Sequence, residues 1–240
     1  MKALVTGASS GIGREMAKIL SDMGYDLILV ARRKKKLEEL KKQLTTKVTI
    51  INLDISSTYN CMKLYDKVKK EDIDIVINNA GFGLFGEFTE TSLDKELDMI
   101  DTNIKAVHTL TKLFLKDFKE KDSGYILNVS SSAAFLSGPL MSTYYATKGY
   151  VLKLTEAIYE ELRREDSNVY IGALCPGPVD TEFNDVANVK FALKGISPSY
   201  CANYAIDMMK KRRIVIVPTL KMKLAVTIGR FISQPLYIKI

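Results

Sequence analysis

Short apolar segments alternate with helical patterns along most of the chain, and this alternation constrains the fold more than any other feature. Seven segments are nearly continuous in apolar residues, as expected for strands buried on both faces of a parallel sheet. They span residues 2–7, 25–32, 47–54, 73–81, 124–131, 168–177 and 213–218. Helical patterns span residues 11–23, 34–44, 58–70, 92–119, 144–165 and 198–211. The alternation predicts a doubly wound α/β domain in which helices flank a seven-stranded parallel sheet.

Length and composition favour a single domain. The chain has 240 residues, and no low-complexity or Pro/Gly/Ser-rich run divides it. We expect one cofactor-binding and catalytic domain over residues 1–219 and a basic, apolar tail over residues 220–240. Three widely spaced cysteines without a CxxC pair favour a reducing, cytoplasmic location. With one histidine we expect no metal site, and with no signal-like or long apolar stretch we expect no membrane span.

The net charge of +7 is concentrated near the C-terminus. Residues 208–240 contain eight basic side chains and no acidic one, so the rest of the chain is nearly neutral. A basic protein can bind nucleic acid, but no aromatic stacking motif or recognition helix accompanies this charge. We therefore expect no nucleic-acid partner.

A glycine-rich turn lies between the first predicted strand and the first predicted helix. Gly7 would permit a tight turn, Gly11 a close approach of backbone to a pyrophosphate, and Gly13 close packing of helix on strand. Free N–H groups and the dipole at a helix N-terminus favour anions. The turn therefore predicts a dinucleotide site, formed by Gly7, Ser9, Ser10, Gly11, Ile12 and Gly13.

The end of the second predicted strand indicates which dinucleotide binds. NAD sites usually place an acidic residue here for the ribose 2′-hydroxyl, whereas this chain has Ala31 and Arg32. A guanidinium pairs well with phosphate, so Arg32 predicts the 2′-phosphate of NADP. Arg33, Lys34 and Lys35 add positive potential, although this run also fits a solvated, basic start of a helix.

Tyr144 and Lys148 lie four residues apart in a predicted helix, so they share a face with Cβ atoms about 5–6 Å apart. A free phenol has a pKa of about 10, which is about 4 kcal/mol from proton exchange near pH 7. An ammonium about 4 Å away supplies about that energy at an effective dielectric constant of about 20. We therefore expect Lys148 to lower the pKa of Tyr144 and make it a general acid/base.

Taken together, these motifs resemble the short-chain dehydrogenase/reductase family over about residues 1–220. The shared motifs are TGASSGIG at residues 6–13, NNAG at residues 78–81, Ser131, Tyr144 with Lys148, and Pro176-Gly177. The resemblance implies a Rossmann-type domain that catalyses reversible carbonyl reduction with the residues Asn103, Ser131, Tyr144 and Lys148. The basic, apolar tail is similar to that of the 3-ketoacyl and hydroxysteroid reductase branch.

The resemblance also implies individual roles at the reacting end of the cofactor. Ser131 would hold and polarise the carbonyl oxygen, with Ser130 and Ser132 as the alternatives. Asn103 could hold a water that links Lys148 to solvent, unless it is an ordinary surface residue.

Further cofactor contacts follow from the same resemblance. Asp54 would face the adenine, unless it caps the helix that follows. Lys148 would also hold the hydroxyls of the nicotinamide ribose. The adenine-side ribose would lie against Asn79, Ala80 and Gly81, and the nicotinamide amide would be flanked by Pro176, Gly177, Val179 and Thr181.

Three loops, 82–91, 133–143 and 181–195, are expected to frame the substrate. Their apolar side chains indicate a hydrophobic ketone or aldehyde, although several of them could simply pack the core. These side chains are Phe82, Leu84, Phe85, Phe135, Leu136, Leu140, Met141, Phe183 and Phe191. We expect residues 181–195 to form a lid over the cofactor.

Residues 220–240 leave two readings of the tail open. We favour packing against the domain or a partner subunit over a helix lying on an anionic membrane, and Pro235 would break any long helix. Family members are usually dimers or tetramers, so we expect a homodimer or homotetramer. The sequence predicts an NADP(H)-dependent oxidoreductase for a hydrophobic ketone or alcohol. The alternative is a non-catalytic NADP-binding regulator, against which the complete Tyr–Lys–Ser set argues.

Overall fold

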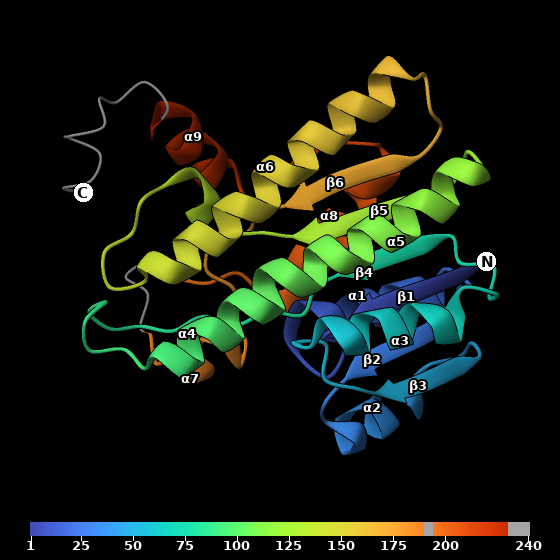
Figure 1. Cartoon of the computed structure of the whole chain (residues 1–240), viewed down its shortest axis with the longest axis horizontal. Coiled ribbons are helices and arrows are strands. Elements are labelled where there is room, and N and C mark those ends of the chain that lie inside the picture. Colours follow the sequence, from blue (N-terminus) through green and yellow to red (C-terminus); the bar gives the residue numbers. More distant parts are fainter. Residues whose placement is uncertain (190–193, 230–240) are drawn as a thin grey trace.

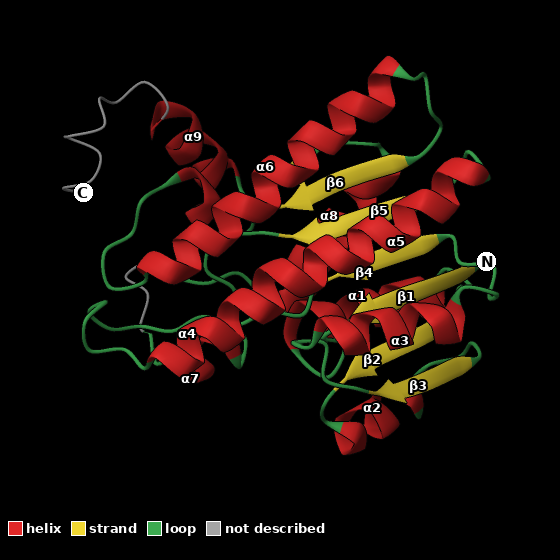
Figure 2. Cartoon of the chain, in the orientation of Figure 1, coloured by secondary structure: helices red, strands yellow, loops and turns green. Residues whose placement is uncertain are grey.

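The computed structural model describes residues 1–189 and 194–229, and its centre is one parallel sheet (Figures 1 and 2). The sheet has seven strands in the order β3-β2-β1-β4-β5-β6-β7, and every pair is parallel. The strands are β1 (Lys2–Thr6), β2 (Asp26–Ala31), β3 (Val48–Asn52), β4 (Ile75–Asn78), β5 (Tyr125–Val129), β6 (Tyr170–Leu174) and β7 (Val215–Ile216). The predicted α/β fold with a seven-stranded parallel sheet is confirmed.

Helices cover both faces of the sheet because its strands are apolar on both sides. In β1, Ala3 and Val5 pack with α1 (Gly11–Asp22), α2 (Lys34–Lys41) and α8 (Pro198–Lys210). Leu4 points to the opposite face and packs with α3 (Thr58–Val68), α5 (Val107–Glu120) and α6 (Ser142–Arg164). Successive side chains of a strand alternate between faces, so each strand contributes to both cores.

Three elements differ from the prediction. The helix expected over residues 92–119 is instead α4 (Leu93–Ile100), a π-helical segment (Asp101–Ala106) and α5. Two short helices were missed: a 3₁₀ turn (Ser132–Phe135) and α7 (Phe183–Val186). Both lie in loops that follow strands at the carboxyl edge of the sheet, where ligands bind in this class of fold.

The tail begins with α9 (Leu220–Gly229), which packs partly on the domain. Val226 is buried, and a Cβ on Gly177 would lie 2.6 Å from the Met222 Cε atom. One side of this helix thus contacts the domain, but the choice between the two readings of the tail stays a prediction. Pro235 and Phe191 lie outside the described residues. The boundary at residue 219 stays a prediction. No helix within residues 1–189 and 194–229 is long and apolar enough to cross a membrane.

Candidate active site

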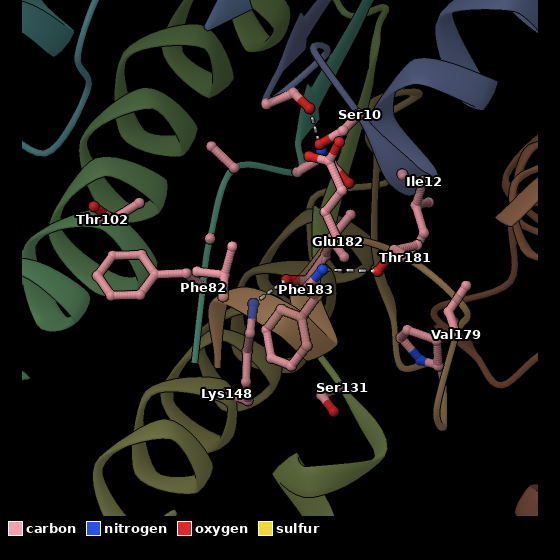
Figure 3. A pocket seen from close by; sticks show the side chains of 18 of the residues that line it. Ser10, Ile12, Phe82, Thr102, Ser131, Lys148, Val179, Thr181, Glu182 and Phe183 are labelled. Atoms are coloured by element: carbon pink, nitrogen blue, oxygen red, sulfur yellow. Dashed lines mark hydrogen bonds between the residues drawn. The ribbon is translucent and has the colours of Figure 1, made fainter. Parts of the chain in front are cut away.

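A cleft of about 370 Å³ runs along the carboxyl ends of the strands (Figure 3). Residues that follow six different strands line it, because parallel strands end at the same edge of a sheet. All residues predicted for the cofactor and the chemistry line this cleft except Gly13 and Asn103, which are buried.

The glycine-rich turn exposes the N-terminus of α1 to the cleft. Gly7 and Gly11 have φ angles of +65° and +57°, a conformation that side chains with a Cβ rarely adopt. Ser10 is the N-cap but makes no side-chain cap hydrogen bond, and the first turn of α1 has no acidic residue. The free N–H groups of this turn therefore fit the diphosphate of a dinucleotide.

Asn79 holds this turn against the loop that follows β4. Its amide Nδ2 donates to the carbonyls of Thr6 at 3.0 Å and Gly7 at 3.2 Å. The Thr6 hydroxyl accepts from the backbone N–H groups of Asn79 and Ala80. A Cβ on Gly13 would lie 2.7 Å from the Gly7 carbonyl oxygen, so glycine permits the close packing. Asn79 lines the cleft, but its amide is committed to backbone.

Of the two adjacent arginines after β2, Arg33 makes the closer contacts in the cleft. Its guanidinium donates to the Ser9 hydroxyl at 2.9 Å and the Ser10 hydroxyl at 2.6 Å. The Arg32 side chain is 71% exposed and lies 3.6 Å from a carboxylate oxygen of Asp54. Sequence reasoning gave Arg33 only a supporting role, because the conformation of the turn decides which of two neighbours points inward.

Asp54 lies in the cleft after β3. Its carboxylate accepts from the Ser56 backbone N–H at 3.0 Å. Burial raises the pKa of Asp54, but the hydrogen bonds from Ser56 and the charge of Arg32 outweigh it, so the pKa is lowered. The alternative role as a helix cap is wrong, because Ser57 is the N-cap of α3 and accepts from the Asn60 N–H.

Tyr144 and Lys148 lie one turn apart on α6, on the face that the spacing predicted. They are 8% and 5% exposed. The Lys148 ammonium lies 5.8 Å from the centre of the Tyr144 ring and donates to the Val129 carbonyl at 2.9 Å. Figure 3 shows Lys148 and Ser131 at the same end of the cleft.

The pKa of Tyr144 moves opposite to the expected direction. Burial raises it to about 12, and a hydrogen bond with Ser131 only partly lowers it. Burial also lowers the pKa of Lys148 to about 8. Removal from water disfavours both the phenolate and the ammonium, and burial is the largest cause of both pKa shifts. At neutral pH the phenol is therefore protonated, which is the form that can donate a proton to a carbonyl oxygen.

The geometry favours Ser131 over Ser130 as the hydroxyl beside Tyr144. The Ser131 side chain is 9% exposed, and its contact with the phenol lowers the pKa of Tyr144. Its Oγ also accepts from the Ala133 N–H at 3.1 Å and so begins the 3₁₀ turn. The Ser130 hydroxyl is instead committed to the Lys148 backbone carbonyl at 2.8 Å.

Asn103 is fully buried in the π-helical segment, so the alternative of a surface residue is wrong. Its Oδ1 accepts from the Phe82 N–H at 3.1 Å, and its Nδ2 donates to the Phe82 carbonyl at 2.9 Å. Nδ2 also donates to the Thr147 hydroxyl at 3.1 Å. Asn103 thus fixes the loop after β4 to α6, one residue from Lys148. The predicted water link stays a prediction.

The substrate end of the cleft has apolar walls. The Phe183 ring lies 5.4 Å from that of Tyr144, and Phe82, Met141 and Phe183 line the cleft as expected. Leu84 packs in the same cluster, whereas Phe85, Leu136 and Leu140 are exposed and Phe135 packs toward α9. Sequence reasoning missed Tyr145 and Val186, which also line the cleft.

Asn184 on α7 was also missed. It lines the cleft, and its side-chain oxygen is buried without a hydrogen-bond partner among the described residues. A buried acceptor without a partner is costly, so it fits a site whose ligand supplies a donor. No sequence pattern identified it, because its position depends on how the segment after β6 folds over the cleft.

Comparisons with known proteins show the family to which the chain belongs. The family model described as short chain dehydrogenase matches residues 1–190. The NADP-dependent 3-hydroxy acid dehydrogenase of Schizosaccharomyces pombe is 36% identical over 191 residues, covering 76% of this chain and 73% of that protein. The very-long-chain 3-oxoacyl-CoA reductase of Homo sapiens is 33% identical over 190 residues, covering 75% of this chain and 60% of that protein.

Among solved structures, a short-chain dehydrogenase from Sphingobium yanoikuyae in complex with NADPH superposes with a TM-score of 0.86. It is 27% identical, and the match covers 97% of this chain and 96% of that chain. Fold and site thus define an oxidoreductase that uses a nicotinamide dinucleotide. More particularly, the chain belongs to the short-chain dehydrogenase/reductase family and acts on CH–OH or carbonyl groups.

Proposed function

We propose that the protein is an NADP(H)-dependent reductase of hydrophobic ketones or aldehydes, with Tyr144 as its general acid/base. The observation that carries this proposal is the convergence of Tyr144, Lys148 and Ser131 in the cleft that also contains the glycine-rich turn. A cofactor-sensing regulator needs no such set. When bound, the cofactor supplies the hydride in reduction and accepts it in oxidation.

The residues at the reacting end divide the remaining work. The Ser131 hydroxyl would hold the substrate oxygen beside Tyr144, which donates the proton that reduction requires. Lys148 would bind the nicotinamide ribose hydroxyls and add positive charge near the developing alkoxide. Asn103 would keep the loop at Phe82 and the helix bearing Lys148 in register. The roles of Pro176, Gly177, Val179 and Thr181 beside the nicotinamide belong to the same proposal, since all four line the cleft.

Charge supports NADP over NAD as the cofactor. Arg32 and Arg33 both line the adenosine end of the cleft, where a 2′-phosphate would lie, and no acidic residue ends β2. Guanidinium groups suit this dianion well. One relative is named as NADP-dependent and one similar structure holds NADPH, which agrees with this assignment.

The walls of the cleft support an apolar substrate. Phe82, Met141, Tyr145, Phe183 and Val186 contribute apolar surface beside Tyr144. The relative from Homo sapiens is named for a very-long-chain 3-oxoacyl-CoA, a substrate with a long apolar chain. We therefore expect a fatty-acyl or sterol-like carbonyl compound.

Cofactor oxidation with a panel of ketones tests the proposal. The panel contains 3-ketoacyl thioesters, sterol ketones and small polar ketones, each with NADPH and with NADH. We expect turnover with an apolar member and a preference for NADPH. Tight cofactor binding without turnover of any ketone, in either direction, would contradict the enzymatic proposal and favour the regulator.

We also propose a cytoplasmic location, since the three cysteines are free and buried. For the assembly we propose a homodimer or homotetramer, as is usual in the family. Light scattering of the purified protein measures the assembly.

α9 exposes Leu220, Leu224 and Ile228, one turn apart, and this stripe is our candidate for peripheral membrane contact. Co-sedimentation with anionic vesicles should fall for Leu224→Glu, and unchanged co-sedimentation of the variant would contradict the contact.

A further inference from the structure

Glu182 crosses the adenosine end of the cleft and bonds with two basic side chains of the opposite wall. Its carboxylate lies 2.6 Å from the Arg33 guanidinium, and its second oxygen accepts from the Lys36 ammonium. These partners lie 149 and 146 residues away in sequence. Hydrogen bonds from Lys36 and from Arg33 lower the pKa of Glu182 to about 2, so it is an anion at neutral pH.

These ion pairs contribute little to folding. The side chains of Glu182 and Arg33 are 44% and 45% exposed, and exposed ion pairs are weak because water screens them. A weak pair is easily displaced by a competing anion. The position of Glu182 therefore calls for an explanation in binding rather than in stability.

The same guanidinium connects Glu182 to the glycine-rich turn. Arg33 donates to Glu182 and also to the hydroxyls of Ser9 and Ser10. The Glu182 carboxylate is therefore the anion bound to the arginine that lies beside the glycine-rich turn. Figure 3 shows Glu182 extending toward Ser10, while its neighbour Phe183 extends toward Lys148. Glu182 thus already pairs with basic side chains that the proposed cofactor would need for its 2′-phosphate.

We propose that Glu182 is a specificity-determining residue, whose carboxylate competes with the 2′-phosphate of NADP for Arg33 and Lys36. This inference rests on the proposed use of NADP. NAD has no phosphate at that position and does not meet the carboxylate, so Glu182 selectively weakens NADP binding. The protein therefore prefers NADP over NAD less strongly than it would if its basic residues faced no carboxylate. The bound NADP also dissociates more readily.

Titration of the full-length protein with NADPH and with NADH tests the inference. We expect Glu182→Gln to bind NADPH about threefold to tenfold more tightly and to bind NADH within twofold of the unchanged protein. The gain should shrink as salt is added, since the competition is electrostatic. The affinity for the fragment 2′,5′-ADP should rise in Glu182→Gln as that for NADPH does. The affinity for 5′-AMP should stay nearly unchanged, as that for NADH does.

Glu160→Gln is the matched control. Glu160 is 40% exposed and also pairs with two basic side chains, Arg163 and Arg164, but at the far end of α6. Unchanged or weaker NADPH binding by Glu182→Gln, or an equal gain for both cofactors, would overturn the inference. If the unchanged protein prefers NADH but Glu182→Gln gains NADPH affinity alone, the cofactor assignment fails while the role of Glu182 stands.

Discussion

Burial shifts the pKa values of Tyr144 and Lys148 in opposite directions. The phenol is held neutral with a pKa of about 12, while the ammonium loses hydration and its pKa falls to about 8. At neutral pH the protein therefore keeps a buried cation near a neutral acid, at a cost in stability. Such a cost is typical of a functional site, since selection for folding alone would remove it.

Lys148→Met should raise the free energy of unfolding of the cofactor-free protein at pH 7 by about 2 kcal/mol. The fall of the lysine pKa from 10.5 to about 8 corresponds to about 3 kcal/mol, and loss of the Val129 hydrogen bond offsets about 1 kcal/mol. Because the folded-state pKa is depressed, the unchanged protein gains stability as pH rises from 8 to 10.5. The difference between the two proteins should therefore narrow over that interval.

Urea unfolding at pH 7 and pH 10 measures this difference. Lys153→Met on the same helix is the control, since its side chain is 73% exposed. Equal stabilisation by both substitutions, or destabilisation by Lys148→Met at both pH values, would contradict the cost assigned to Lys148.

Ser131 and Ser130 form a matched pair for the hydroxyl beside Tyr144. Ser131→Ala should lower kcat by about 10²–10³-fold, as loss of a donor at a reacting oxygen does elsewhere. Ser130→Ala removes the bond to the Lys148 carbonyl, so it should cost about 1 kcal/mol of stability with less than about a tenfold loss of kcat. Steady-state kinetics and unfolding curves of both variants measure these effects. A larger loss of kcat in Ser130→Ala than in Ser131→Ala would refute the role of Ser131 beside Tyr144.

At this scale the sequence located residues better than it predicted their properties. The i, i+4 spacing placed Tyr144 and Lys148 on one face because helix geometry is local. The direction of the Tyr144 pKa shift was wrong, because burial by segments remote in sequence decides it. Asn184 was missed because its position depends on how a remote segment folds, and Arg33 was given only a supporting role because the conformation of the turn decides which arginine points inward.

At the scale of elements, the π-helical segment between α4 and α5 is the main departure from expectation. An i→i+5 turn is one residue wider than an α-helical turn, and such segments frequently occur at functional sites. Here it buries Asn103 against the loop after β4. Sequence periodicity over residues 92–119 could not reveal the segment, since it occupies only Asp101–Ala106.

Asn103→Ala should lower the free energy of unfolding by about 2–3 kcal/mol. Its three hydrogen bonds are lost, and the backbone groups of Phe82 are left without their partner. Asn203→Ala on the exposed surface of α8 should change stability by less than about 0.5 kcal/mol. Thermal or urea unfolding compares them, and equal effects would show that Asn103 does not hold the loop.

At the scale of the whole molecule, alternating strands and helices predicted the layers and the edge at which the cleft forms. Buried parallel strands leave a strong apolar signal, and their carboxyl ends must meet. The wall of the cleft formed by the segment after β6 was less predictable, because α7 has only four residues and its place depends on contacts with distant elements. The membrane and subunit contacts of the tail stay predictions.

NADPH should stabilise the folded molecule more than NADH at equal concentration. A ligand that binds only the folded state at 100 times its Kd adds about 2.7 kcal/mol. Arg33→Ala should lose most of the extra effect of NADPH and keep that of NADH, because only NADPH carries the 2′-phosphate. Arg164→Ala, at the end of α6, is the control. Thermal unfolding with each cofactor measures the stabilisation. An equal loss of stabilisation by NADPH and by NADH in Arg33→Ala would contradict the role of Arg33.

The proton donor is the centre of the account, and single-turnover reduction of an apolar ketone by the NADPH-loaded protein tests it most directly. Tyr144→Phe should bind NADPH within about twofold of the unchanged protein and reduce the ketone at least about 10³-fold more slowly. Tyr150→Phe, on the exposed side of the same helix, should reduce it at the original rate. Reduction by Tyr144→Phe at an undiminished rate would show that another group supplies the proton.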